Sequence, residues 1–227
     1  MPEPWFDRTR RVGTALALMV FPLLFVAIYA AHPNLLAFKP LLTLDDWTGR
    51  FHRRPLLHAA HAVMTLAVPL LVVSAYHFAH VLRGRGAWFG LIGGAMAIVG
   101  AVILAADKGA LCLVPSAFDT LPPAAFEALR PGLVVMQARE GWLVILWLLP
   151  LLPLGFVVQG IGLLRERLVG RAEGAALIAG SLLLANPDIE ALSLVASLLL
   201  TAALWSYGLR LLRRPTTELA TIAPRML

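Results

Sequence analysis

Six apolar stretches, each long enough to cross a lipid bilayer, constrain this chain more than any other feature of its sequence. A membrane-spanning helix needs about 20 predominantly apolar residues. The chain is 59% hydrophobic and 14% charged, whereas soluble domains carry roughly 25% charged residues. The sequence therefore predicts an all-α, polytopic membrane protein with a single domain, residues 1–227, and excludes soluble, collagen-like and disordered classes. The six predicted spans are residues 12–31, 56–82, 87–106, 140–164, 171–185 and 189–212.

The first and fifth of these apolar stretches differ from the others. Arg8, Arg10 and Arg11 precede the first stretch, as basic residues precede the apolar part of a signal peptide. Its apolar run is too long for a signal peptide, so we expect residues 12–31 to be retained as a helix. The fifth stretch is the shortest, and it ends at the turn signal Asn186-Pro187-Asp188.

Basic residues predict the orientation of the spans, because cytoplasmic loops of membrane proteins are enriched in arginine and lysine. With the N-terminus inside, 12 of the 19 basic residues lie on the inner side and 7 on the outer side. The Arg50–Arg54 cluster opposes this bias. We expect both termini in the cytoplasm and the chain in the inner (cytoplasmic) cell membrane. The arginine-rich inner loops favour anionic lipid headgroups over nucleic acid as partners, and they leave room for a membrane-protein partner.

The two longest loops lie on the predicted outer side, at residues 32–55 and 115–137. Both alternate apolar and polar residues, which is typical of segments that lie on a membrane surface. In the second loop, Pro122, Pro123 and Pro131 frame a short predicted helix. The inner links are very short, so a functional site is expected at the outer face.

Two of the predicted spans carry a distinctive stripe. In the second span, polar side chains fall within an arc of about 100° when each residue advances by 100°, which predicts that this stripe faces the interior of the bundle. The stripe consists of His58, His61, Thr65, Tyr76 and His80, while Ser74 and His77 lie off it. In the third span, small residues from Gly90 to Ala101 form a groove that predicts close helix packing. Pro150 and Pro153 predict a kink in the fourth span.

Ionisable residues gather where the predicted spans end on the outer side. The candidate polar site consists of His58, His61, Asp107, Lys108, Glu140 and Asp188. Other polar residues at the same predicted level are His32, His52, Gln137, Arg139, Asn186 and Glu190. Charges at this depth are tolerated when they are paired or bound to metal. The first expectation is therefore a structural or accessory role in which these groups only form salt bridges, and no catalytic residue is assigned.

A metal site is one alternative function for these residues. His58 and His61, three residues apart, share a helix face, and with Asp107, Glu140 or Asp188 they would supply ligands for zinc or iron. A metal-dependent membrane hydrolase would use such a site. The residue inventory superficially resembles that of membrane hydrolases of the alkaline ceramidase type, which use histidines and an aspartate around zinc. The number of spans differs from that family, and no longer motif is shared.

Two further alternatives use the same end of the molecule. Histidines beside Asp107, Glu140 and Asp188 could take up and release protons near neutral pH, as in a small proton- or ion-coupled transporter. The sequence shows no broken helix with facing charged groups, which counts against transport. A haem held by His32 with His58 or His61 is the least favoured alternative. The single cysteine, Cys112, excludes an intrachain disulfide and any cysteine-rich metal centre.

Overall fold

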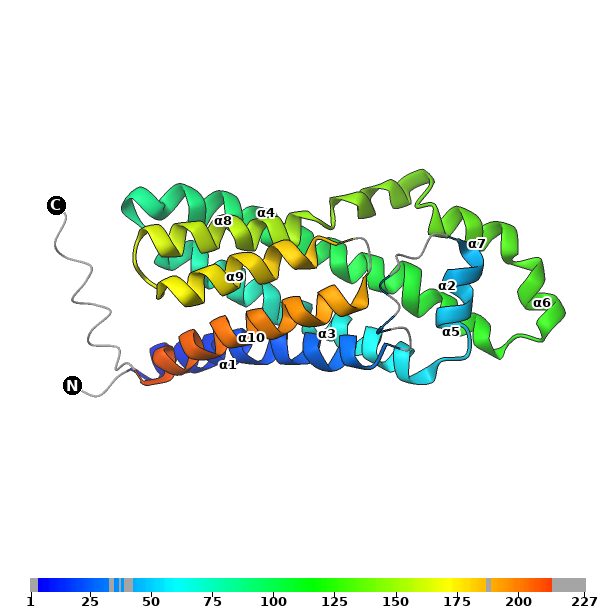
Figure 1. The fold of residues 1–227 in the computed structure, drawn as a ribbon, viewed down its shortest axis with the longest axis horizontal. Helices are drawn as coiled ribbons and strands as arrows, with labels where there is room; N and C mark the ends of the chain where they lie inside the picture. The colour runs from blue at the N-terminus through cyan, green and yellow to red at the C-terminus, as the bar shows by residue number, and fades with distance from the viewer. Residues whose placement is uncertain (1–3, 33–34, 37, 39–42, 187–188, 214–227) are drawn as a thin grey trace.

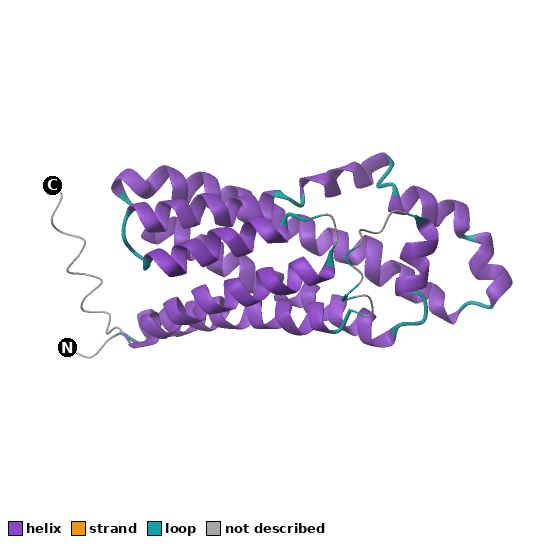
Figure 2. Cartoon of the chain, viewed as in Figure 1, coloured by secondary structure: helices purple, strands orange, loops and turns teal. Residues whose placement is uncertain are grey.

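The computed structural model describes residues 4–32, 35–36, 38, 43–186 and 189–213, apart from the side chains of Gly49 and Arg50. All regular structure in these residues is helical (Figures 1 and 2), so the predicted all-α class is confirmed. The longer helices are α1 (Trp5–Ala30), α3 (Pro55–Val81), α4 (Ala87–Lys108), α8 (Leu151–Arg165), α9 (Arg171–Leu184) and α10 (Glu190–Arg213). The shorter ones are α2 (Leu44–Phe51), η1 (Gly84–Gly86), η2 (Gly109–Leu113), α5 (Val114–Ala117), η3 (Phe118–Thr120), α6 (Pro123–Ala128), α7 (Arg130–Gln137) and η4 (Gly141–Leu148).

The longer helices run lengthwise in one bundle (Figure 1). Helix α1 packs on α3 and α10, α4 packs on α3 and α8, and α9 lies between α8 and α10. Helix α1 begins and α10 ends at the same end of the bundle, here called the terminal end, where the Arg11 guanidinium donates to the backbone carbonyls of Leu211 (3.2 Å) and Leu212 (2.7 Å). Helices α2, α5, α6 and α7 lie at the opposite end, here called the capped end.

Among the residues that the structure describes, five helical segments are long and apolar enough to cross a membrane: Trp5–Ala30, Pro55–Val81, Gly84–Thr120, Arg130–Arg165 and Glu190–Arg213. They agree with five of the predicted spans. The remaining one, residues 171–185, corresponds to α9, which has 14 residues. A helix of this length rises about 21 Å, less than the roughly 30 Å of a bilayer's hydrocarbon core. The multi-pass class is therefore supported, while a sixth crossing does not follow from helix length.

Two of the spanning segments depart from regular α-helix, although the sequence shows no broken helix with facing charged groups. After Lys108 the third segment widens into a single stretch of π-helix, η2, and then continues to Thr120, well past its predicted end at residue 106. The fourth segment consists of α7, the 3₁₀-helix η4 and α8. Its break between η4 and α8 lies at Pro150, as the predicted kink requires. Both interruptions lie toward the capped end (Figure 1).

Small residues bring α4 and α8 into backbone contact, which confirms the predicted groove. Gly93, Gly100 and Gly155 are all buried. A Cβ atom added at Gly100 would lie 2.1 Å from the backbone nitrogen of Leu152, and one at Gly155 would lie 2.4 Å from the backbone nitrogen of Ala97. Within a membrane, such packing replaces the hydrophobic effect as the force that associates helices.

Replacing Gly100 with alanine should therefore destabilise the bundle by about 1–3 kcal/mol, because neither backbone can move away without opening the contact. The matched control is Gly13→Ala in α1, where an added Cβ meets nothing within 4 Å and the better helix propensity of alanine should leave stability equal or slightly higher. Thermal unfolding of both variants in detergent measures the difference. Equal midpoints for the two variants would contradict the tight contact.

The polar stripe of the second span faces the interior over only part of its length. His61 is buried, but Tyr76 and His80 are exposed, while Ser74 and His77, which lie off the predicted stripe, turn inward. The buried residues of α3 repeat every seven positions: Leu57, Met64, Leu71 and Phe78 form one row, Ala60, Ala67 and Ser74 a second, and His61, Val68 and Ala75 a third. This is the 3.5-residue period of supercoiled helices, which drifts by about 20° per heptad relative to a straight helix. The drift carries Tyr76 and His80 out of the interface, so the prediction was wrong for these two residues.

Candidate functional site at the capped end

A cavity of about 80 Å³ lies inside the bundle near its capped end. Its polar lining consists of His32, His61, Asp107, Lys108, Arg139 and Glu190. The rings of Trp47 and Phe51, on one face of α2, cover it. We call this cavity the polar chamber. It draws its lining from α1, α2, α3, α4, α10 and the junction between α7 and η4, so residues far apart in the sequence meet there.

A buried carboxylate with two cations forms one wall of the polar chamber. The side chain of Asp107, the penultimate residue of α4, is almost completely buried, with the whole residue 2% exposed. The Lys108 ammonium lies 3.1 Å from its Oδ2 atom, and the Arg139 guanidinium donates to its Oδ1 atom over 3.4 Å. Removing the Asp107 carboxylate would take the shared negative charge away from two cations in a low-dielectric setting, which is strongly unfavourable.

Arg139 reaches the polar chamber because the backbone turns sharply at this residue. Its φ of 55° lies in the left-handed region, which costs a non-glycine residue about 1–3 kcal/mol. The turn separates α7 from η4, and it places the guanidinium beside Asp107 and 4.7 Å from the ring centroid of Trp147. The next residue, Glu140, is exposed and does not line the cavity.

The backbone is also irregular on the other side of the ion pair. The π-helix η2 follows directly after Lys108, and two of its residues, Leu111 and Cys112, line the polar chamber. Single π-helical turns inside α-helices are rare and occur frequently at functional sites. Both segments that supply the ion pair, α4–η2 and α7–η4, are therefore irregular at the point where they meet the cavity.

Two histidines and a second carboxylate complete the lining. His61 is 2% exposed, and its ring stacks on Phe51, with 5.3 Å between centroids, and meets His32 edge to face at 5.4 Å. Glu190, the first residue of α10, is 4% exposed. Before this helix, the side-chain oxygen of Asn186 accepts a hydrogen bond from the backbone nitrogen of Ile189. The chamber thus gathers two buried carboxyl groups and two imidazoles.

A separate polar cluster, the Asp119 clasp, joins the α2–α3 connection to the end of the third segment. Asp119 accepts three hydrogen bonds: from His52 Nδ1 (2.9 Å), from His58 Nε2 (2.8 Å) and from the backbone nitrogen of Arg53 (2.9 Å). The Nδ1 atom of His58 is buried and has no hydrogen-bond partner among the residues the structure describes. The clasp therefore anchors the segment from which α2 extends over the polar chamber.

The predicted site residues divide between these two clusters. His61, Asp107 and Lys108 line the polar chamber, His58 belongs to the Asp119 clasp, Glu140 faces outward, and Asp188 lies outside the described residues. Sequence reasoning assigned no role to Asp119. The available signal was the apolar helical run after Lys108, which carries the third segment on to this residue.

This geometry does not support the two cofactor hypotheses. His58 and His61 contact different groups, and no three His, Cys, Asp or Glu side chains in the described part of the chain are grouped so that they could hold a metal ion. The rings of His32 and His61 touch directly, so a haem does not fit between them. The cavity is also far smaller than the roughly 300–1,000 Å³ of sites for drug-sized ligands.

The fold and the site together define a class of protein. In the described part of the chain, five apolar helical segments are long enough to span a membrane, which indicates a multi-pass membrane protein, and the ion-paired chamber lies among them. Comparison of the chain with family models, with curated proteins and with solved structures gives no match. Function must therefore be argued from the chemistry of the polar chamber itself.

The Asp119 clasp yields a direct prediction. Replacing Asp119 with alanine removes three hydrogen bonds and should lower stability by on the order of 1 kcal/mol. It should also raise amide hydrogen exchange in residues 44–54, because α2 and its connection to α3 lose their anchor. Mass spectrometry after exchange in detergent measures this, with the exposed Glu140→Ala as the control. Unchanged exchange in residues 44–54 would refute the anchoring role.

Proposed function

We propose that the chain crosses the membrane six times, with both ends in the cytoplasm and the capped end outside. Helix α9, packed lengthwise against α8 and α10, is the sixth crossing. The Arg210 guanidinium of α10 pairs with Glu173 near the start of α9, which keeps the two helices in register near the terminal end. A bilayer thins locally around a short crossing at modest cost. An even number of crossings also agrees with α1 beginning and α10 ending at one end of the bundle.

Exposed aromatic residues support the same placement. Tryptophan is enriched at both membrane–water interfaces. Trp5 and Trp88, at the starts of α1 and α4, are exposed toward the terminal end, and Trp142 and Trp147 are exposed in η4, toward the capped end. The arginine-rich link at residues 165–171 lies at the terminal end, where the positive-inside rule requires it.

Cysteine labelling in whole cells tests this topology. In a Cys112→Ala background, Ala125→Cys in α6 should react with a membrane-impermeant maleimide, whereas Leu168→Cys in the α8–α9 link should react only after the cells are opened. Both original residues are exposed in the structure, so accessibility in the fold does not bias the comparison. If Leu168→Cys is labelled in intact cells, the proposed orientation is reversed. If both sites are labelled in intact cells, the proposed number of membrane crossings is wrong.

We further propose that the protein is a small proton-coupled transporter with its proton site in the polar chamber. One observation carries this: two interrupted spanning segments bring Asp107, Lys108 and Arg139 together beside buried titratable groups. In secondary transporters, sites for substrates and coupling ions are typically formed by discontinuous helices. Irregular backbone at membrane depth is tolerated where it lines a cavity or is buried in protein.

The size and chemistry of the polar chamber favour the proton as the coupling ion. A cavity of about 80 Å³ has room for several water molecules, since one water needs roughly 10–15 Å³ of such volume. Lys108 and Arg139 beside Asp107 disfavour a metal cation through charge repulsion. Glu190, His32 and His61 are groups that exchange protons. Glu190 is the one we expect to carry the coupled proton.

The conformation described here is closed toward the terminal end. Packed rings of Phe21, Phe78 and Phe156 fill the bundle core between the polar chamber and that end. The hydroxyls of Ser197 and Thr201 on α10 donate to their own helix backbone, to the carbonyls of Ser193 and Ser197, so they do not form a relay through this layer. Transport would require α4–η2 or η4–α8 to move at their interruptions and open it.

Removing the Glu190 carboxyl group tests the proposal. The wild-type protein should show a carboxyl infrared band that titrates with pH, and proteoliposomes containing it should pass protons down an imposed pH gradient. Glu190→Gln should lose the band and slow the flux about tenfold or more, equivalent to at least about 1.4 kcal/mol of barrier. Glu140→Gln, in an exposed glutamate, should retain both.

A structural role for the ion pairs is the competing candidate, and the same measurements separate the two. It is favoured by the pairing of Asp107 with both nearby cations. A structural network predicts that Glu190→Gln lowers the unfolding temperature without changing proton flux. Flux equal to that of protein-free liposomes for every variant would rule out a proton pathway through the polar chamber that operates without a substrate.

A further inference from the structure

A second cavity, of about 420 Å³, lies between α2 and the helices α6 and α7. Helix α2 separates it from the polar chamber. Trp47 and Phe51 face the chamber, whereas Asp45 and Thr48, on a different face of the same helix, line the second cavity together with His52, which directly follows the helix. We call this second cavity the α2 groove. Its volume falls within the roughly 300–1,000 Å³ of sites for small organic ligands.

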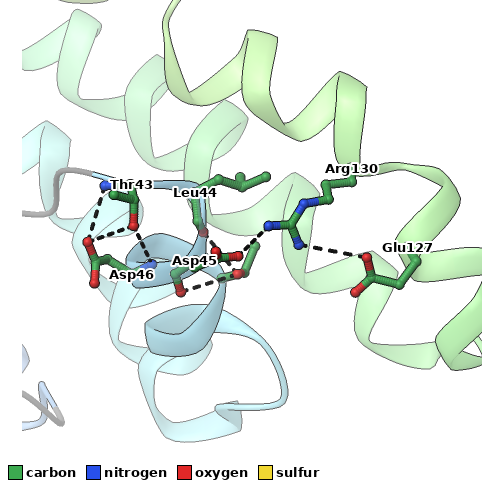
Figure 3. A network of polar contacts seen from close by, with 7 residues as sticks. Thr43, Leu44, Asp45, Asp46, Glu127 and Arg130 are labelled. Atoms are coloured by element: carbon green, nitrogen blue, oxygen red, sulfur yellow. Dashed lines mark hydrogen bonds and ion pairs between the residues drawn. The ribbon is translucent and has the colours of Figure 1, made fainter.

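Charges of both signs line the α2 groove at close range (Figure 3). Arg130 donates to Asp45 and lies 3.7 Å from Glu127. The three side chains are 45%, 75% and 64% exposed, respectively. Ion pairs between groups this exposed contribute little to stability. A ligand with complementary charges can therefore replace the partners in these ion pairs at a low cost in free energy.

The base of the α2 groove is rigid although its rim is exposed. The His52 ring stacks on Phe126 with 4.0 Å between centroids, and its Nδ1 atom donates to Asp119. Arg53, with a φ of 56°, is held in the left-handed region while its backbone nitrogen donates to the same carboxylate. Strained residues persist where the surrounding structure holds them, often at ligand sites. The Asp119 clasp thus pre-forms one side of the groove.

The α2 groove lies at the level where apolar segments end. Pro55 begins one membrane-spanning segment, Thr120 ends the next, and Arg130 begins the following one. Arg53, Pro123 and Arg130, which line the groove, lie within three residues of these ends in the sequence. The segments Gly84–Thr120 and Arg130–Arg165 have 37 and 36 residues, more than the about 20 that cross the hydrocarbon core, so in a bilayer their ends reach the headgroup region. The molecules present there at highest concentration are phospholipid headgroups.

We propose that the α2 groove binds the headgroup of a zwitterionic phospholipid that carries a phosphate and a primary ammonium, as phosphatidylethanolamine does. The guanidinium groups of Arg53 and Arg130 bind the phosphate, because their forked donors match phosphate oxygens. The ammonium, with three donors, lies between the carboxylates of Asp45 and Glu127. Each charge of the ligand then meets the opposite charge, and no new charge is buried unpaired.

Lipid binding to the purified full-length protein in detergent tests this proposal. Native mass spectrometry with dioleoyl-phosphatidylethanolamine should show a bound lipid, whereas dioleoyl-phosphatidylglycerol, which lacks the ammonium, should bind about tenfold more weakly. Arg130→Gln should lower the affinity for phosphatidylethanolamine by a similar factor. Arg54→Gln is the matched control, because Arg54 is exposed and adjacent to Arg53 but does not line the groove.

A second variant distinguishes a specific loss of lipid binding from misfolding of Arg130→Gln. Glu127→Gln removes one carboxylate from an exposed position, so it should weaken phosphatidylethanolamine binding while leaving phosphatidylglycerol binding unchanged. Equal affinity of the wild-type protein for both lipids would overturn the zwitterion assignment. Unchanged phosphatidylethanolamine binding in both Arg130→Gln and Glu127→Gln would overturn the location.

Free phosphoethanolamine, titrated calorimetrically, separates a lipid from a soluble source of the same chemistry. Binding of the lipid at least about tenfold tighter than the free compound supports a lipid site, and equal or tighter binding of the free compound would overturn it. The inference does not depend on proton coupling. Glu190→Gln, which alters the polar chamber, should still bind phosphatidylethanolamine more tightly than phosphatidylglycerol.

Discussion

The backbone's need for hydrogen bonds in hydrocarbon is the constraint on which the rest of this structure depends. In a bilayer core, an unpaired N–H or C=O group costs several kcal/mol, so lipid-facing segments must be helical. This chain keeps continuous helices over most of its length and departs from them at η2 and at η4. Leu111 and Cys112 of η2 line the polar chamber, and Arg139 lines it from the turn that precedes η4. The irregular backbone of η2 therefore borders a cavity, whereas η4 itself is largely exposed.

Close helix packing at glycine residues stabilises the structure next to these irregular segments. Between the interruptions and the terminal end, α4 and α8 approach so closely at Gly93, Gly100 and Gly155 that a single added Cβ would clash with backbone. This rigid contact holds the two interrupted segments together on the side away from the polar chamber. The left-handed turn at Arg139 and the π-helix at Gly109–Leu113 are then held in place by the packed pair of helices α4 and α8.

How much of the fold and the site the sequence predicts depends on which physical property each sequence pattern reflects. Apolar runs and small-residue spacing encode burial along a helix, so five of the six predicted spans and the Gly90–Ala101 groove agree with the structure. The same patterns do not encode supercoiling, which turned Tyr76 and His80 outward. These patterns also do not indicate which carboxylate of a loop forms a hydrogen bond with which histidine in the folded chain. His58 therefore pairs with Asp119, which no local motif distinguishes, rather than with the acids at the predicted span ends.

Helix α2 has only eight residues, yet it forms a wall of both cavities, and this has a consequence for how they behave together. If α2 is displaced as a rigid body, Asp45 and Thr48 on one face move together with Trp47 and Phe51 on another. Any molecule that binds more tightly to one position of α2 must therefore change the free energy of filling the polar chamber, and filling the chamber must change the affinity for that molecule by the same factor. Lipid composition would then act on the protein as an allosteric effector.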